Sequence, residues 1–310
     1  TVADTTAPTV ASYVPGLGST GQAATVNIVL TFSENVQAGS GNIVLSPATG
    51  SPVTIAAGDG QVGYSSTAVT IDPTSDLSTA GMQYTVTMAA GVITDSSAEA
   101  AAYAGLSGTT YQFTVADTTA PTVASYVPGL GASAVTASAN IVLTFSENVQ
   151  AGSGNIVLTP ATGSAVSIAA GDGQVGYSTT AVTIDPTSDL STAGMQYTVT
   201  MAAGVITDSS AEAAAYAGLS GTTYQFTVAD TTAPTVASYV PGLGSTGQAA
   251  TVNIVLTFSE NVQAGSGNIV LSPATGSPVT IAAGDGQVGY SSTAVTIDPT
   301  SDLSTAGMQY

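Results

Sequence analysis

The sequence contains no lysine, arginine, histidine, cysteine or tryptophan in 310 residues. Without cysteine and histidine the chain has no disulfide, no thiolate nucleophile, no imidazole base and no zinc-finger ligand set. Without lysine and arginine it has no positive surface for nucleic acid, no phosphate clamp and no salt bridge between side chains. These absences exclude nucleic-acid binding and most kinds of enzyme.

Charge of either sign is also scarce. Charged residues make up 6% of the chain and all 19 are Asp or Glu, whereas an ordinary soluble domain has roughly 25% charged residues. The apolar residues are interspersed with Thr, Ser and Gly, and no run approaches the roughly 20 apolar residues that span a membrane. A net charge of −19 repels phosphate backbones and anionic lipid, and it favours cations as partners.

An internal repeat organises the whole chain. The string TVADTTAPTVASYVPGLG begins at Thr1, Thr114 and Thr227, a period of 113 residues, and the second copy departs from the first mainly at Ala132–Ala139. A period of this length corresponds to one whole domain and not to a short solenoid unit. We therefore predict domains at 1–113, 114–226 and 227–310, the third lacking its last strands. We expect a longer chain to continue the third copy; its completion by strand addition from a neighbouring chain is the alternative.

Each copy alternates apolar and polar residues in short runs separated by turn-forming residues. Val26, Ile28, Leu30 and Phe32 alternate with Asn27, Val29 and Thr31, a two-residue period that indicates a strand with one buried face. Seven such runs at about ten-residue spacing predict an all-β fold of tandem Ig-like sandwiches. Residues 95–105 have a helical composition that allows one or two turns. The predicted strands are 9–14, 25–32, 41–46, 53–57, 67–72, 83–90 and 109–115.

The acidic residues fall almost entirely in the predicted connections. Because consecutive antiparallel strands alternate in direction, every second connection returns to the pole of the sandwich that receives the N-terminal linker. We call this end the linker pole and the opposite end the far pole. Asp4, Glu34, Asp59, Asp95 and Glu99 are predicted at the linker pole of the first copy. Asp72 and Asp76 are predicted at its far pole, which meets the linker pole of the next copy.

This placement predicts acidic clusters at the domain junctions. Clustered carboxylates repel one another, and the sequence offers no basic residue to compensate them. Ca²⁺ is a suitable counter-ion because it takes six to eight oxygen ligands in flexible geometry. Asp117 is the first candidate ligand, followed by Glu147 and Asp208. The full set of candidate metal ligands is Asp117, Glu147, Asp208, Asp72, Asp76, Asp230 and Glu260.

A purely local interpretation of each acid stands beside the metal hypothesis. Asp72 precedes a proline, and Asp59 lies in a Gly-Asp-Gly string, so both are typical turn formers. The prediction of the poles also depends on the number of strands. An additional strand at Val62–Ser66 would reverse the later loops and separate the predicted cluster.

The strings DTTAPTV, NIVLTFSENVQAGSGNIVL and the closing TYQFTV resemble the bacterial Ig-like domains of S-layer proteins and of very large repeat adhesins. The resemblance covers each copy almost completely. It implies a non-catalytic sandwich used as a spacer or lattice unit, often with Ca²⁺ at loops and linkers. The linker acid of the motif corresponds to Asp4, Asp117 and Asp230, and the acid after the second strand corresponds to Glu34, Glu147 and Glu260.

The sequence therefore favours an extracellular structural repeat protein over an enzyme. Expected partners are copies of the same chain, in a lattice or filament, or neighbouring repeats of a longer chain. A carbohydrate- or cell-binding adhesion module is the alternative, and it would require exposed aromatic residues around a groove. Tyr84, Tyr111 and Phe113 are instead predicted to lie in the core or at a strand edge.

Overall fold

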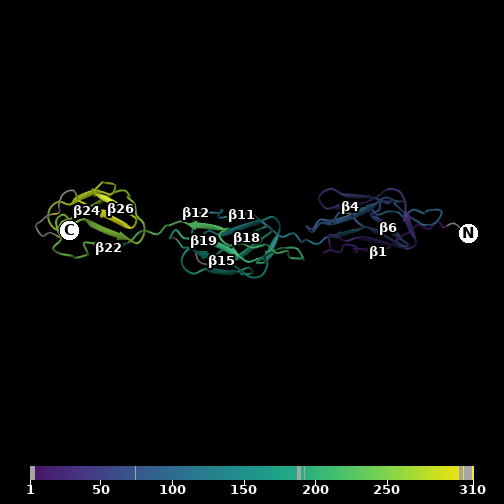
Figure 1. Cartoon of the computed structure of the whole chain (residues 1–310), viewed down its shortest axis with the longest axis horizontal. Helices are drawn as coiled ribbons and strands as arrows, with labels where there is room; N and C mark the ends of the chain where they lie inside the picture. Colours follow the sequence, from purple (N-terminus) through teal and green to yellow (C-terminus); the bar gives the residue numbers. More distant parts are fainter. Residues whose placement is uncertain (1–3, 74, 187–189, 192, 300–302, 304–308) are drawn as a thin grey trace. The chain divides into compact units, whose positions relative to one another are not determined.

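The computed structural model describes residues 4–73, 75–186, 190–191, 193–299, 303 and 309–310 (Figure 1). In these residues the chain forms strands and turns and no helix, which confirms the predicted all-β class. Within the same ranges, no helix is long and apolar enough to cross a membrane. The chain divides into two compact units, residues 1–230 and 231–310, and each is described by itself.

The first repeat is a sandwich of two four-stranded sheets with a small two-stranded ribbon. One sheet has the order β1-β2-β7-β6, the other has the order β10-β8-β4-β5, and β3 pairs with β9. Its strands are β1 (Val10–Val14), β2 (Ile28–Phe32), β3 (Val36–Ala38), β4 (Asn42–Pro47), β5 (Val53–Ala56), β6 (Val62–Ser65), β7 (Ala68–Ile71), β8 (Gln83–Met88), β9 (Ile93–Asp95) and β10 (Gln112–Thr114).

Alternation along the strands builds the core. In β2 the side chains of Ile28, Leu30 and Phe32 are buried while those between them are partly exposed, as the two-residue period predicts. β4 and β8 contribute Ile43 and Val86 from the facing sheet. Each fully buried side chain of this size stabilises the fold by about 2 kcal/mol, so the sandwich is held mainly by apolar burial between its sheets.

The aromatic residues belong to this core, as predicted. Tyr111 and Phe113 have no exposed surface and Tyr84 is 6% exposed. The hydroxyl of Tyr111 donates to the carbonyl oxygen of Pro15 at 3.0 Å, so its one polar atom is satisfied inside the sandwich. These rings therefore stabilise the repeat and do not form a surface platform.

The structure contains the additional strand β6, but this strand does not reverse the later loops. Some neighbouring strands are halves of a single crossing of the sandwich. β3 and β4 together run antiparallel to β9 and β8, because Val36 pairs with Asp95 and Ile43 pairs with Met88. β5 and β6 together make the return crossing, with β5 in one sheet and β6 in the other. The repeat therefore keeps seven crossings, and the alternation of poles persists.

Asp59 does not lie at the linker pole, so this expectation is wrong. It is located between β5 and β6, where the chain passes from one sheet to the other. The adjacent Gln61 accepts a backbone hydrogen bond from Asp72 at 2.8 Å, directly after β7. The end of β7 pairs with the start of β2, whereas Glu34 follows the end of β2. Asp59 therefore lies near the end of the β2–β7 sheet opposite to the end that Glu34 follows.

The helical turns expected at 95–105 are also absent, and this expectation is wrong too. β9 continues to Asp95, and Thr94 then forms an isolated bridge with Ala102. The backbone N–H of Ala101 donates to Asp95 Oδ1 at 3.1 Å, and the N–H of Gly91 donates to the carbonyl of Tyr103 at 2.9 Å. These tertiary hydrogen bonds override the alanine-rich composition of the segment.

The second repeat has the same strands with one addition. β12 pairs in parallel with β21 and extends that sheet to five strands, in the segment where the two copies differ most. The strands are β11 (Val123–Val127), β12 (Ala132–Val135), β13 (Ile141–Phe145), β14 (Val149–Ala151), β15 (Asn155–Pro160), β16 (Val166–Ala169), β17 (Val175–Ser178), β18 (Ala181–Ile184), β19 (Gln196–Met201), β20 (Ile206–Asp208) and β21 (Gln225–Val228).

The unit 231–310 has a four-stranded sheet of order β22-β23-β27-β26 and the two-stranded sheet β24-β25. Its described core is smaller: Ile281, Val288, Val295 and Ile297 are buried, and its other apolar core residues are half-buried. Its strands are β22 (Val236–Val240), β23 (Ile254–Phe258), β24 (Asn268–Leu271), β25 (Val279–Ala282), β26 (Val288–Ser291) and β27 (Ala294–Ile297).

Candidate metal site

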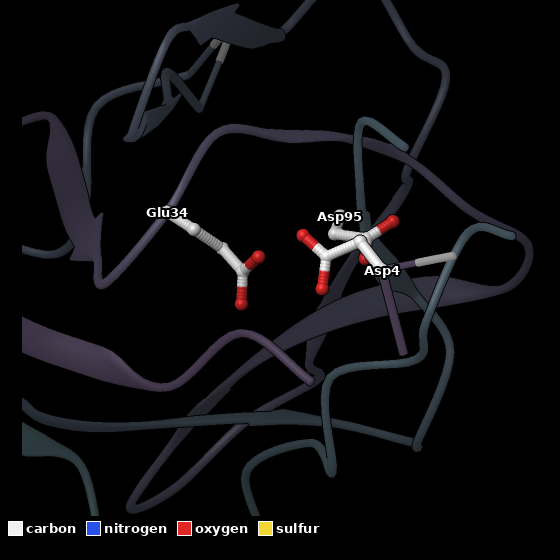
Figure 2. Close-up of side chains that lie close together, drawn as sticks. All are labelled: Asp4, Glu34 and Asp95. Atoms are coloured by element: carbon white, nitrogen blue, oxygen red, sulfur yellow. The ribbon is translucent and has the colours of Figure 1, made fainter. Parts of the chain in front are cut away.

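Two carboxylate clusters occupy equivalent positions in the first and second repeats. One consists of Asp4, Glu34 and Asp95, and the other of Asp117, Glu147 and Asp208. In each cluster one carboxylate oxygen of every residue lies within 4.8 Å of those of the other two. Figure 2 shows the first cluster, in which the Glu34 carboxylate faces those of Asp4 and Asp95 across an open space. Oxygen ligands of one Ca²⁺ are separated by up to about 5 Å, so each cluster has a suitable spacing.

Asp117 reaches the second cluster from the linker. Its Oδ1 accepts the backbone N–H of Thr119 at 3.1 Å, which forms an Asx turn at the DTTAP string. Its backbone pairs with Ala80 of the first repeat, and the N–H of Thr118 donates to the carbonyl of Thr79 at 2.8 Å. The linker backbone is thus attached to the preceding repeat, while the side chain of Asp117 belongs to the cluster of the following repeat.

Glu147 is positioned by the turn after β13. The N–H of Ser146 donates to the carbonyl of Thr122 at 2.8 Å, and Ser146 Oγ accepts the N–H of Thr122 at 3.0 Å. This reciprocal pair holds the linker against the end of β13. Glu147 is therefore brought to the linker pole beside Asp117.

Asp208 is the last residue of β20 and is 1% exposed. Its Oδ1 accepts three hydrogen bonds, from the N–H and hydroxyl of Ser210 at 3.0 and 2.8 Å and from the N–H of Ala214 at 3.1 Å. Its Oδ2 is buried and has no hydrogen-bond partner, and the same holds for Oδ2 of Asp95. A buried carboxylate oxygen without a partner is costly, and a bound cation would satisfy it.

The clustered charges affect the glutamate of each cluster. Desolvation raises the pKa of Glu147 above its ordinary value of 4.5, and the nearby Asp117 and Asp208 raise it further. The pKa of Glu34 is raised in the same way, by desolvation first and then by Asp4 and Asp95. Each glutamate is thus protonated more readily than a free glutamate side chain when no cation is bound.

A pH dependence follows for the cation-free protein. A carboxyl group whose pKa is higher in the folded state than its unfolded value of 4.5 contributes stability that is present below 4.5 and is lost as pH rises through the raised pKa. In chelator we therefore expect the stabilisation of wild type relative to Glu147→Gln to decrease as the pH rises above about 4.5. Denaturant unfolding of both proteins at each pH measures this difference. A difference that is constant or increases with pH would contradict the expectation.

The second cluster lines a cavity of about 420 Å³ that both repeats of the unit 1–230 form. The first repeat contributes the turn at Thr20 and Gly21 and the segment at Ala80 and Gly81. The second repeat contributes the three clustered acids and the segment 208–212. The first cluster lines a smaller cavity of about 300 Å³, formed by its three acids with Asn35, Ser96 and Ser97.

The other candidate ligands lie elsewhere. Among the described residues, Asp72 and Asp76 belong to neither cluster, and both are exposed. From the far pole of the first repeat, Ala80 and Gly81 line the cavity at the second cluster instead. They belong to the same connection as Asp72 and Asp76. Asp230 pairs with Ala193 at the end of the first unit, in the manner of Asp117 and Ala80. Glu260 follows β23 in the second unit and is half-buried. Asp189, the equivalent of Asp76 in the second repeat, lies outside the described residues.

Sequence reasoning missed the residues that hold the buried aspartates. Ser97 and Ser210 donate both backbone and side-chain hydrogen bonds to Asp95 and Asp208. The signal was present in the Asp-Ser-Ser string, because serine two residues after aspartate is typical of an Asx turn. The composition of the following alanine-rich segment pointed to a helix instead.

Comparison with known proteins gives a family for the whole chain. The profile of the bacterial Ig-like domain matches residues 4–115, 117–228 and 230–310. No curated protein matches the sequence. Solved structures that match the chain include the FN1–FN3 domains of chicken CNTN1, at 10% identity, with a TM-score of 0.34 and coverage of 92% of this chain and 89% of that chain. A three-Ig segment of titin, an E-to-A variant, gives 10% identity, a TM-score of 0.39 and coverage of 97% and 90%.

The family match covers nearly every residue, in three consecutive stretches. Domains of this family are typically structural, non-catalytic modules of extracellular or surface proteins, and a tandem array fits an extracellular repeat or adhesion-type protein. The chain therefore belongs to the bacterial Ig-like domain family, of which it carries three tandem members.

Proposed function

We propose that the protein is an extracellular spacer that builds a fibre, a surface layer or an adhesin stalk, and that Ca²⁺ stiffens its junctions. Its function is then mechanical: each sandwich resists unfolding through its core, and each junction resists bending. Its partners are copies of the same chain or neighbouring repeats of a longer one.

The dual attachment of Asp117 is the observation that carries this proposal. Its backbone pairs with Ala80 of the first repeat, whereas its carboxylate is grouped with Glu147 and Asp208 of the second. A cation bound by these three carboxylates would attach the linker to the second repeat as firmly as hydrogen bonds attach it to the first. The linker would then lose the freedom to bend between the repeats.

The donor set favours Ca²⁺ among the common cations. All three side chains offer hard carboxylate oxygens, and the sequence has no cysteine or histidine to select a softer metal. The three ligands come from separate segments of the chain, which suits the flexible coordination of Ca²⁺ better than the strict octahedron of Mg²⁺. The Oδ2 of Asp208 is buried without a hydrogen-bond partner, so a bound cation would satisfy it.

Small-angle scattering and thermal unfolding of the full chain, in Ca²⁺ and in chelator, test the proposal. We expect a larger maximum dimension, a narrower range of conformations and a higher Tm with Ca²⁺. Asp72→Asn is the matched control, because it removes one exposed acid outside the cluster. Identical scattering and melting curves in both buffers would refute cation stiffening, and the spacer function would then rest on the fold alone.

The alternative of a glycan-binding module receives less support. In the unit 1–230 the aromatic rings pack against one another in pairs such as Tyr84–Phe113 and Tyr197–Phe226, whose centroids are 5.9 Å apart. The described aromatics that are markedly exposed, Tyr239 and Tyr310, lie in the unit 231–310. A sugar-binding groove normally presents several exposed rings together.

A further inference from the structure

The two carboxylate clusters consist of equivalent residues but differ in their surroundings. Asp4 is exposed in the first cluster, whereas the equivalent Asp117 is half-buried in the second. The cavity at the second cluster is lined by a fourth acid, Glu212, and by the turn of the preceding repeat around Gly21. The cavity at the first cluster does not include Glu99, the residue equivalent to Glu212.

Gly21 and Glu212 are in close approach across the cavity. A Cβ atom added at Gly21 would lie 3.1 Å from Oε1 of Glu212, which is tighter than an ordinary van der Waals contact. Gly21 also has a φ of 67°, a conformation that side chains disfavour. Glycine at this position leaves room for the exposed Glu212 carboxylate to lie beside the turn of the first repeat.

The second repeat carries a different residue at the position of Gly21. Ala134 is located there, with a φ of 54°, within the segment that differs most between the copies. The third copy has glycine again, Gly247. The chain thus contains two natural variants of this turn, one with glycine and one with a methyl group at this position.

We propose that Glu212, together with the turn around Gly21, sets the cation affinity of the junction between the first and second repeats. Glu212 adds a fourth carboxylate to a cavity in which the buried Oδ2 of Asp208 already lacks a partner. A fourth negative charge raises the affinity for a divalent cation by direct attraction. This inference rests on the proposed cation site, and it names the residues that determine the cation affinity of that site.

Calorimetric Ca²⁺ titration of the full chain tests the inference. The background variant Asp95→Asn removes a ligand of the first cluster, so the second cluster is the only intact triad in the described part of the chain. In this background we expect Glu212→Gln to weaken binding roughly fivefold and Glu99→Gln to leave it unchanged. Glu99→Gln is the matched control because it removes the same charge from the equivalent loop, outside the cavity.

A loop exchange separates the role of the turn from the role of the charge. Residues 19–26 are replaced by the sequence of residues 132–139, which the second repeat accommodates in an equivalent sandwich with the additional strand β12. We expect affinity to fall by a similar factor, with no further loss when Glu212→Gln is added. If Glu212→Gln matches Glu99→Gln, or the exchange leaves affinity unchanged, the inference fails. If the unmodified chain binds no Ca²⁺, the proposed cation site itself fails.

Discussion

Asp208→Asn is expected to stabilise the second repeat in chelator and to destabilise it in Ca²⁺. In chelator the substitution removes a buried negative charge that faces Asp117 and Glu147 without any basic partner. The asparagine oxygen can still accept the hydrogen bonds that Ser210 and Ala214 donate. In Ca²⁺ the same substitution removes a ligand, and with it the stabilisation that binding confers, about 2.7 kcal/mol at a hundredfold excess over Kd.

Differential scanning calorimetry of the full chain in both buffers measures this reversal. Asp95→Asn is expected to behave in the same way for the first repeat, whose buried aspartate has the same partners and the same unpartnered oxygen. Asp185→Asn, an exposed acid after β18, provides the control and should change neither melting curve. A destabilisation of equal size with and without Ca²⁺ would show that Asp208 has only a structural role.

Gly218→Ala is expected to destabilise the second repeat by about 4 kcal/mol, a large part of the 5–15 kcal/mol that stabilises a typical domain. A Cβ atom at this position would lie 2.5 Å from the carbonyl oxygen of Met201 and 2.7 Å from the carbonyl carbon of Ala202. These are backbone atoms at the end of β19, so they cannot move aside as a flexible side chain would. The φ of Gly218, 89°, adds strain for any side chain.

Gly221→Ala separates the overlap from the backbone strain. Gly221 also has a positive φ, 58°, but a Cβ atom there would meet nothing within 4 Å. We expect this control to cost only about 1 kcal/mol. Urea unfolding followed by circular dichroism gives both values. Equal effects of the two substitutions would show that strain alone matters and that the packing of this loop against β19 tolerates a methyl group.

The sequence predicted much of the fold because its local signals agree with one another. Alternation along β2 identified the buried face, and turn-forming residues separated the crossings. It failed where tertiary contacts decide the conformation. The segment 95–105 has alanine-rich composition, yet hydrogen bonds to Asp95 and Ile93 hold it as an irregular loop. Between β5 and β6 the chain passes from one sheet to the other, and no local sequence pattern predicts this. Because of this passage, Asp59 does not lie at the linker pole.

The sequence also predicted which acids of the second repeat are grouped, but it did not predict which residues of the first repeat lie beside them. Strand parity placed Asp117, Glu147 and Asp208 at one pole, where the structure brings them within 4.8 Å. It also placed Asp72 and Asp76 at the far pole of the first repeat, beside this cluster, but neither residue belongs to it. Strand parity specifies only the end of the sandwich at which a loop lies and not its position within that end. The backbone groups that contact the linker from the first repeat, those of Thr79 and Ala80, come from a different part of the same connection.

By itself the sequence determined the repeat, the all-β class and an acidic surface without any basic partner, since these depend only on composition and periodicity. Only the tertiary structure decided that one oxygen of Asp208 is buried without a partner and that Gly21 lies beside Glu212. These features depend on distances between segments about 90 to 190 residues apart along the chain, and such distances are fixed by the packing of sheets, loops and linker and not by local preference.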